Sequence, residues 1–133
     1  MEPLDTPPPK PLQGEIWYAK LATDPPEYLG RPVVVVSLNA RNQEDRADTV
    51  LVVPLSTTIK DPLQKTNLRL APGETNLNEW SELQASGITT IRKKLLHPPR
   101  TKLRQISRSK IQLLVPMVGM AMGFLPEELA DLK

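Results

Sequence analysis

The segment that decides the fold is Gly30-Arg31-Pro32-Val33-Val34-Val35-Val36-Ser37. Its valines are β-branched and wholly apolar, which is typical of a strand that is buried on both faces. The proline stands at the entry of this run, where a strand tolerates a residue without an N–H. Arg31 therefore lies at the mouth of a buried strand, and we expect the scaffold to present its cation there.

A second apolar run, 49–54, predicts another strand buried on both faces, which we expect Pro54 to end. Further strands are expected at 15–21, 66–70, 82–91 and 102–106. Within the longest of these, Gly87 allows a bend or a bulge. Two doubly buried strands favour a small barrel or a tightly curled sheet over an open sandwich.

Near Ser107 the apolar pattern changes from the period of a strand to that of a helix. Ser107 or Ser109 suits the N-cap position. The apolar residues at helical spacing are Ile111, Leu114, Val115, Val118 and Met122. Apolar side chains also occupy the opposite face, so we expect the helix to pack on the sheet and on a partner subunit. The uncharged run is shorter than the ~20 residues of a membrane span and contains Pro116, so we expect no membrane association.

The length of 133 residues suits one domain with a single core. We expect a proline-rich, flexible N-terminal arm at 1–13 and a single barrel domain at 14–133. The arm has no apolar run and does not resemble a signal peptide. The chain contains no cysteine, which excludes disulfides and thiolate metal ligands and fits a reducing compartment such as the cytoplasm.

The net charge is only +2, but the charges are distributed unevenly. Residues 83–126 contain no Asp or Glu and hold eight of the 17 Lys and Arg residues. These eight are Arg92, Lys93, Lys94, Arg100, Lys102, Arg104, Arg108 and Lys110. A one-sided basic region indicates a polyphosphate partner. A basic face that is only solvated is the alternative.

Several familiar catalytic arrangements are absent from the sequence. His97 is the single histidine, so a two-histidine ribonuclease site is impossible and a zinc site would have to use carboxylates. No glycine-rich phosphate loop precedes a helix, and no G-x-S-x-G elbow occurs. We therefore expect neither a metal ion nor a cofactor. His97 stands beside two prolines, which is more typical of a loop residue than of a general base.

An ordered set of short segments resembles the MazF/PemK family of toxins from type II toxin–antitoxin modules. The segments are Gly14-Glu15-Ile16-Trp17, Gly30-Arg31-Pro32 before the valine strand, Val53-Pro54-Leu55-Ser56-Thr57, Thr90-Ile91, and Leu103-Arg104-Gln105-Ile106-Ser107. Each is a weak signal alone, but their order is fairly specific. The resemblance, which spans residues 14–124, implies an α+β, mainly β fold. The implied architecture is an SH3-like antiparallel barrel of the CcdB/MazF type with a C-terminal helix.

The resemblance also implies an activity. Members of this family form homodimers and cleave single-stranded RNA at short sequences, without a metal ion, by attack of the 2′-hydroxyl on the adjacent phosphate. An antitoxin neutralises them by covering the RNA groove with a disordered tail. We therefore expect single-stranded RNA, a cognate antitoxin and a second copy of the chain as partners. The reaction needs a base, an acid, and a cation or other donors for the phosphate.

The family motif carries its functional residues onto particular positions here. Arg31 matches the arginine at the strand entry and would stabilise the phosphorane or donate a proton. Ser56, or Thr57 beside it, matches the hydroxyl that would position the scissile phosphate. A salt bridge at the strand end is the structural alternative for Arg31.

The sequence departs from the family where an acid is expected. The family typically has an acid there, sometimes with an arginine two residues earlier, and the matching positions carry Ser86 and Gln84. We expect these two residues to share one face of a strand. Neither acts as a base at neutral pH, but Gln84 can hydrogen-bond a base or a phosphate, and Ser86 can bond a 2′-hydroxyl. Ser86 is kept as a candidate catalytic residue. The expected RNA-binding residues are Gln84, Thr89, Arg92, Lys93, Lys94, Arg100, Lys102 and Arg104.

An endoribonuclease toxin is therefore the leading hypothesis, and the missing acid leaves a different class open. A non-catalytic module on the same barrel would bind RNA or an antitoxin, or would bind DNA gyrase as CcdB does. The match at Gly30-Arg31-Pro32 favours the MazF-like alternative over the CcdB-like one.

Overall fold

The structure is a computed structural model, and it describes residues 7–22, 24–26 and 30–130. Within these ranges a six-stranded antiparallel sheet has the order β1-β2-β3-β5-β4, with β6 paired to β3. The strands are β1 (Ile16–Ala19), β2 (Arg31–Val35), β3 (Thr49–Ser56), β4 (Asn67–Leu70), β5 (Ser81–Gln84) and β6 (Thr89–Arg92). The helices are α1 (Asn39–Asn42), α2 (Arg108–Ala121) and α3 (Pro126–Ala130), and the 3-10 turns are η1 (Pro72–Glu74), η2 (Ala85–Gly87) and η3 (Lys93–Leu95). This agrees with the predicted α+β, mainly β, class.

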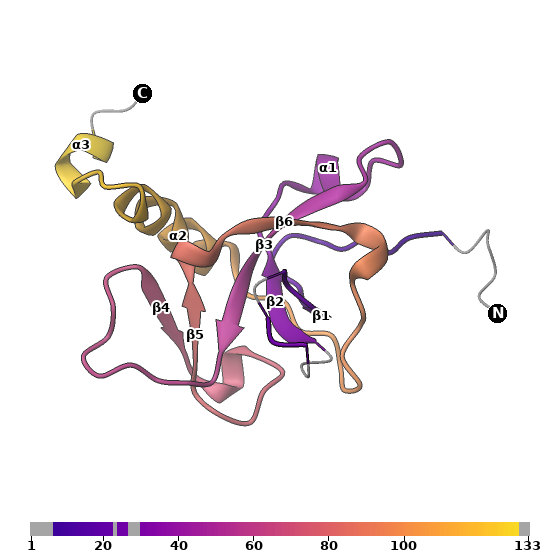
Figure 1. Cartoon of the computed structure of the whole chain (residues 1–133), viewed down its shortest axis with the longest axis horizontal. Coiled ribbons are helices and arrows are strands. Elements are labelled where there is room, and N and C mark those ends of the chain that lie inside the picture. The colour runs from indigo at the N-terminus through magenta and orange to yellow at the C-terminus, as the bar shows by residue number, and fades with distance from the viewer. Residues whose placement is uncertain (1–6, 23, 27–29, 131–133) are drawn as a thin grey trace.

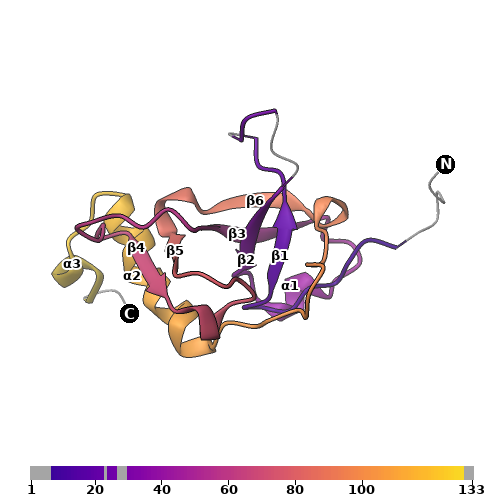
Figure 2. The same cartoon turned by 90° about the horizontal axis from the view of Figure 1, so that it is seen from below.

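β3 organises the sheet because it changes partner along its length (Figure 1). On one side it pairs with β2. On the other side its first part pairs with β6, up to Val52 opposite Thr89, and its end pairs with β5, from Leu55 opposite Leu83. Seen from below, β1 and β2 lie on one side of the molecule and β4, β5 and α2 on the other (Figure 2). The sheet is therefore curled around β3, as the sequence predicted.

The prediction that Pro54 ends the third strand is wrong, because β3 continues to Ser56. Pro54 stands opposite Val33 of β2, at the point where the other side of β3 changes from one partner to the next. At such a break no neighbouring strand accepts a hydrogen bond from the backbone N–H, so a proline, which has none, is tolerated. Gly87 packs closely here, since a Cβ on it would lie 3.0 Å from Pro54 Cγ.

Two further strand predictions are wrong. The single strand expected at 82–91 is two strands, separated by η2, and these pair with different parts of β3. Residues 102–106, all of them described, form no regular strand and make only an isolated bridge, from Gln105 to Glu15. The chain there runs beside β1 and donates the Ile106 N–H to the Gly14 carbonyl at 2.7 Å.

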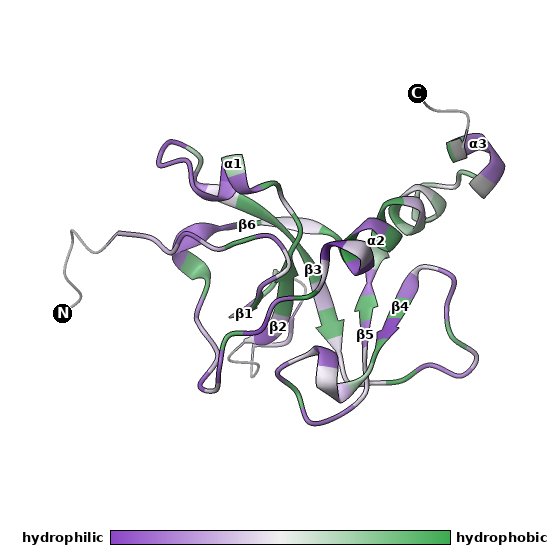
Figure 3. Ribbon diagram, turned by 180° about the vertical axis from the view of Figure 1, so that it is seen from behind, coloured by the Kyte–Doolittle hydropathy of each residue, from purple (hydrophilic) through white to green (hydrophobic). Residues whose placement is uncertain are grey.

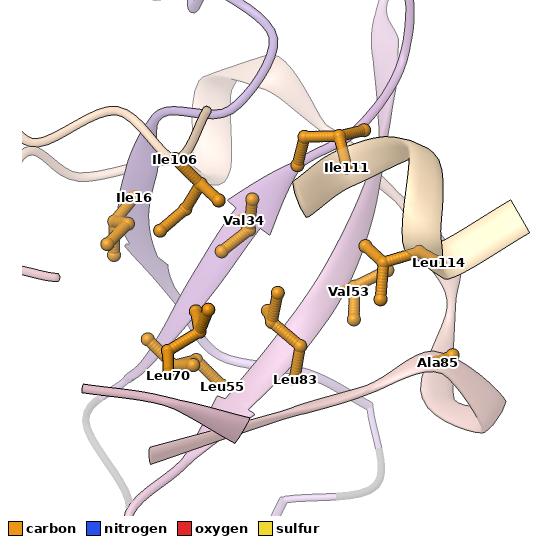
Figure 4. Packing of buried hydrophobic residues seen from close by; sticks show 10 residues of the cluster. All are labelled: Ile16, Val34, Val53, Leu55, Leu70, Leu83, Ala85, Ile106, Ile111 and Leu114. Carbon is orange, nitrogen blue, oxygen red and sulfur yellow. The ribbon is translucent and has the colours of Figure 1, made fainter. Parts of the chain in front are cut away.

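The valines of β2 and β3 are buried on both faces, which confirms the prediction from the sequence. Val34 and Val53 belong to a cluster that Leu114 of α2 helps to cover (Figure 4). Val33 and Val35 point the other way, into a second cluster with residues of β1, β3 and β6. Burial of each such side chain stabilises the fold by roughly 1.5–3 kcal/mol. The two clusters together therefore fix the positions of both strands.

α2 begins after Ser107, whose side chain accepts a hydrogen bond from the Lys110 N–H, so this N-cap prediction is confirmed. The helix continues through Pro116. One face packs on the sheet, whereas the exposed fractions of Val115 and Met122 are 71% and 70%. Figure 3 shows apolar colour on the central strands and along α2. The prediction that a partner subunit covers the exposed side stays a prediction.

Part of the predicted N-terminal arm contacts the domain. Residues 1–6 of the arm lie outside the described residues. The Gln13 N–H donates to Asn39 Oδ1 of α1 at 2.7 Å, and Gln43 Nε2 donates to the Pro11 carbonyl at 2.9 Å. The end of the arm is thus attached beside α1, and the domain boundary at residue 14 stays a prediction.

Candidate functional site

Arg31 and Ser56 lie at the same end of the curled sheet. β2 begins at Arg31 and β3 ends at Ser56, and the two strands are antiparallel with Val33 opposite Pro54. Extending this register by two residues places Arg31 opposite Ser56. Ser56 is partly buried, and Thr57 after it is exposed. The structure thus brings the candidate cation and the candidate hydroxyls to one place.

A buried carboxylate orients Arg31. Arg31 Nε lies 2.9 Å from Asp24 Oδ1, and the side chains of the two residues are 27% and 2% exposed. The other oxygen of Asp24 accepts a hydrogen bond from the Leu21 N–H at 2.9 Å. The ion pair at the strand end, which was the structural alternative for Arg31, is therefore present. Part of the arginine also faces solvent, so the geometry accommodates a structural and a catalytic role together.

Ser56 caps the turn that follows β3. Its Oγ accepts a hydrogen bond from the Thr58 N–H at 3.1 Å. A hydroxyl that accepts one hydrogen bond still has its own O–H to donate. Ser56 can therefore offer a donor to a phosphate oxygen without leaving its place in the turn.

Glu82 lies opposite Ser56 in the β3–β5 ladder and is fully buried. Its Oε2 accepts hydrogen bonds from the Lys60 N–H at 3.1 Å and from Arg69 Nε at 3.2 Å. Its Oε1 accepts from Asn67 Nδ2 at 3.1 Å. Burial alone would raise the pKa of Glu82, but these hydrogen bonds and the charge of Arg69 outweigh burial and hold the pKa below its ordinary value.

Glu82 is thus not available as a general base. Glu82 is closed to solvent, and its carboxylate is already paired. Because its pKa is lowered, the ion pair is complete above the ordinary pKa of a glutamate and is lost only as the pH falls through the lower, folded value. At neutral pH Glu82 therefore stabilises the local structure and does not take part in proton transfer.

Gln84 and Ser86 do not share a strand face, so that part of the prediction is wrong. Gln84 is the last residue of β5 and stands opposite Asn67, whereas Ser86 lies in η2. Gln84 is two residues beyond Glu82, a distance of ~7 Å along the strand. η2 contacts both α2 and β3. The structure therefore places Gln84 in the sheet and Ser86 in the turn that follows it.

One group of predicted RNA-binding residues borders Arg31 through its ion-pair partner. Thr89 and Arg92 are exposed on β6. They line a hollow of about 700 Å³ together with Asp24. An RNA segment in this hollow would meet a cation and a hydroxyl beside the Arg31 end of the sheet.

A second group borders Arg31 from the 97–104 segment. Arg100 and Gly30, the neighbour of Arg31, line a hollow of about 440 Å³. Lys102 and Arg104 line a further hollow along the same segment. All three basic residues are exposed. The basic region thus continues away from Arg31 along one path over the surface.

Lys93 does not belong to that basic surface, contrary to the expectation from the sequence. It is 3% exposed, and its Nζ donates to the carbonyls of Arg41 at 3.0 Å and Glu44 at 2.8 Å. Lys94, the next residue, is exposed. Lys93 therefore holds the segment that follows α1, and we leave it out of the proposed RNA surface.

Substituting these two lysines separates the two roles. Lys93→Met is expected to lower the free energy of unfolding by about 1–3 kcal/mol, because the carbonyls of Arg41 and Glu44 lose the hydrogen bonds from the buried ammonium, and to leave the salt dependence of RNA binding unchanged. Lys94→Met is expected to leave stability within about 0.5 kcal/mol and to reduce the salt slope of RNA binding by about 1 if Lys94 contacts a phosphate. Urea denaturation and RNA titration at several salt concentrations measure both. Weaker RNA binding by Lys93→Met at unchanged stability would contradict this assignment.

Over residues 7–22, 24–26 and 30–130, no group of three or more His, Cys, Asp or Glu side chains is placed to hold a metal ion. Over the same residues, no helix has the length and apolar character needed to cross a membrane.

Solved toxin structures share this fold. An endoribonuclease from Mycobacterial species, in complex with its cognate antitoxin, gives a TM-score of 0.63 at 22% identity, covering 86% of this chain and 97% of that one. The Mycobacterium tuberculosis toxin MazF-mt6 gives 0.62 at 20% identity, covering 83% and 97%. A chain of a MazE-MazF crystal structure from Deinococcus radiodurans gives 0.62 at 14% identity, covering 87% and 99%. The architecture is therefore the MazF-type barrel with a C-terminal helix, as expected.

The sequence identifies the family directly. Residues 12–116 match the family described as PemK-like, MazF-like toxin of type II toxin-antitoxin system. This match covers most of the chain, so the chain belongs to that family of toxins. A comparison with curated proteins found no match.

The sequence did not point to three residues that shape the site. Asp24 orients Arg31, and Glu82 pairs with Arg69. The alternation Leu68-Arg69-Leu70 does place Arg69 on the polar face of a strand. The register that brings Arg69 to Glu82 is set by the β4–β5 pairing, which no local pattern contains.

Proposed function

We propose that this toxin is an endoribonuclease that cleaves single-stranded RNA without a metal ion. The observation that supports the proposal is that Arg31 begins β2 and Ser56 ends β3 at the same end of the sheet. Asp24 and Gly30, the ion-pair partner and the chain neighbour of Arg31, each line a hollow that also contains exposed basic residues. In the proposed reaction, the 2′-oxygen of one nucleotide attacks the adjacent phosphorus and the bond to the 5′-oxygen breaks. The products are a 2′,3′-cyclic phosphate and a 5′-hydroxyl.

Each proposed catalytic residue has one role. Arg31 stabilises the charge that accumulates on the phosphorane and supplies a proton to the leaving 5′-oxygen. Ser56 and Thr57 donate hydrogen bonds that hold the phosphate in line for attack. Gln84 binds the RNA, and Ser86 approaches a 2′-hydroxyl only if the RNA extends to η2. The proton of the attacking hydroxyl passes to water, because the acid nearest to Ser56 is buried.

The partners are proposals of the same kind. We propose that the chain acts as a homodimer in the cytoplasm and that a cognate antitoxin binds it. The exposed apolar side chains of α2 and of the residue that follows it, among them Val115 and Met122, support a protein partner on that side of the molecule.

A catalytically inactive relative that binds RNA or antitoxin is the second candidate. The observation that favours it is that both carboxylates described at this end of the sheet are engaged in ion pairs, Glu82 with Arg69 and Asp24 with Arg31. The two candidates differ in turnover and not in binding.

Incubation of the purified protein with a long single-stranded RNA distinguishes them. If the protein is an endoribonuclease, we expect cleavage that persists in EDTA and leaves a cyclic phosphate at the 3′ end of one product. Salt-sensitive RNA binding is expected from either candidate. Binding without any cleavage would overturn the enzyme and leave the binding module.

A further inference from the structure

An ion pair between Glu82, which is fully buried, and Arg69, whose side chain is 33% exposed, holds a stretch of backbone next to the candidate site. Arg69 Nη2 lies 2.9 Å from Glu82 Oε2 and also donates to the Lys60 carbonyl at 2.6 Å. Glu82 Oε2 in turn accepts a hydrogen bond from the Lys60 N–H at 3.1 Å. Both polar backbone groups of Lys60 are therefore held by a single ion pair.

The sheet holds the other end of the same stretch. Ser56 ends β3 and stands opposite Glu82 in the ladder. Glu82 thus fixes Ser56 through backbone pairing and Lys60 through its carboxylate. Between these two anchors, the Thr58 N–H bonds to Ser56 Oγ at 3.1 Å, which closes the turn. The position of Thr57, inside this short segment, is set from both sides.

Stability alone does not account for burying the Glu82 carboxylate. Desolvation of a buried charge costs about as much as the attraction of its partner returns, and an apolar residue of similar volume is often equally stabilising. The planar guanidinium of Arg69 reaches the Glu82 carboxylate and the Lys60 carbonyl together, which an apolar side chain cannot do. The pair is therefore suited to fixing one particular conformation of the segment 56–60.

We propose that Glu82 and Arg69 are positioning residues for the candidate site. Their ion pair fixes the segment 56–60 and so sets the positions of the Ser56 and Thr57 hydroxyls at the end of the sheet that carries Arg31. Neither residue touches the RNA; both act through the segment that they hold. This inference deepens the proposed function and rests on it for its catalytic part.

Glu82→Gln tests the proposal in the full-length chain, because glutamine keeps the shape of glutamate and removes its charge. Hydrogen exchange of the Lys60 amide is measured without RNA, and kcat and KM are measured on a single-stranded RNA. Exchange at Lys60 is expected to rise about 10- to 100-fold relative to amides of β2, since the amide loses a charged acceptor. kcat is expected to fall about 100-fold, with KM within about threefold, because the hydroxyls are displaced.

Two further variants make the test specific. Asp45→Asn is the control: this exposed acid pairs with Lys10 at 2.8 Å, and its loss is expected to change neither measurement. Arg69→Lys keeps a positive charge beside Glu82 but removes the fork that reaches the Lys60 carbonyl. It is expected to shift both measurements in the same direction as Glu82→Gln, but by a smaller amount. If Glu82→Gln does not fold, Arg69→Lys takes its place as the test.

The outcomes separate this inference from the proposed function. Unchanged exchange of the Lys60 amide in the folded variants would show that the ion pair does not hold the segment 56–60, and would overturn the proposal. Faster exchange with unchanged kcat, or an equal rise across β2, would overturn the positioning role, because the pair would then be only structural. A wild-type protein that cleaves no RNA would overturn the proposed function, while the exchange experiment, which contains no RNA, still decides whether the ion pair holds the segment.

Discussion

Arg31→Ala is expected to lower kcat for RNA cleavage by about 100- to 1,000-fold while the protein still folds and binds RNA. The reason is that Arg31 is the cation at the end of the sheet that carries Ser56, where charge is proposed to accumulate on the phosphorane. Single-turnover cleavage of a single-stranded RNA measures the loss, and a titration of the same RNA measures the retained binding.

Asp24→Asn is the matched control for this variant. It breaks the same 2.9 Å ion pair as Arg31→Ala but keeps the cation. If Arg31 acts in catalysis, we expect Asp24→Asn to retain activity within about tenfold of wild type, since the guanidinium is less well oriented but still present. Equal losses of activity in the two variants would show that only the ion pair matters and would contradict a catalytic Arg31.

Leu83→Ala is expected to cause a large loss of stability, about 2–5 kcal/mol in the free energy of unfolding. Leu83 is fully buried on β5, opposite Leu55 of β3, in the cluster that also contains Leu114 of α2 (Figure 4). Truncation leaves a cavity at the meeting point of three elements, none of which can move without losing its own contacts. Urea denaturation followed by circular dichroism measures the loss.

Leu63→Ala is the control with the same chemical change. Leu63 lies between β3 and β4 and is 44% exposed, so its truncation is expected to cost less than about 0.5 kcal/mol. Similar losses in the two variants would contradict the description of the core around Leu83.

The sequence was informative wherever one local pattern decided the structure. The uninterrupted valines at 33–36 predicted a strand buried on both faces, and burial of Val33, Val34 and Val35 confirms it. The N-cap at Ser107 was equally local. Pro54 was misjudged because a proline can continue a strand where the neighbouring strand changes, and that change depends on the whole sheet.

The candidate site likewise combines features that a local sequence pattern predicts with features that depend on contacts distant in the sequence. Arg31 was predicted at the strand entry, and the structure places it there. Lys93 looked like its exposed neighbour Lys94 because the carbonyls that bury it come from Arg41 and Glu44, about 50 positions away along the chain. The Glu82 network was hidden for the same reason, since its donors come from the preceding strand and loop.

The partner change along β3 also determines how the molecule comes apart. β3 contributes Val52 to the cluster that contains Val33 and Val35, and Val53 to the cluster under α2, so the two clusters have one strand in common. Neither half keeps a closed core once this strand leaves. Loss of β3 therefore opens both halves together, and the domain is expected to unfold in a single cooperative step with no stable half-folded form.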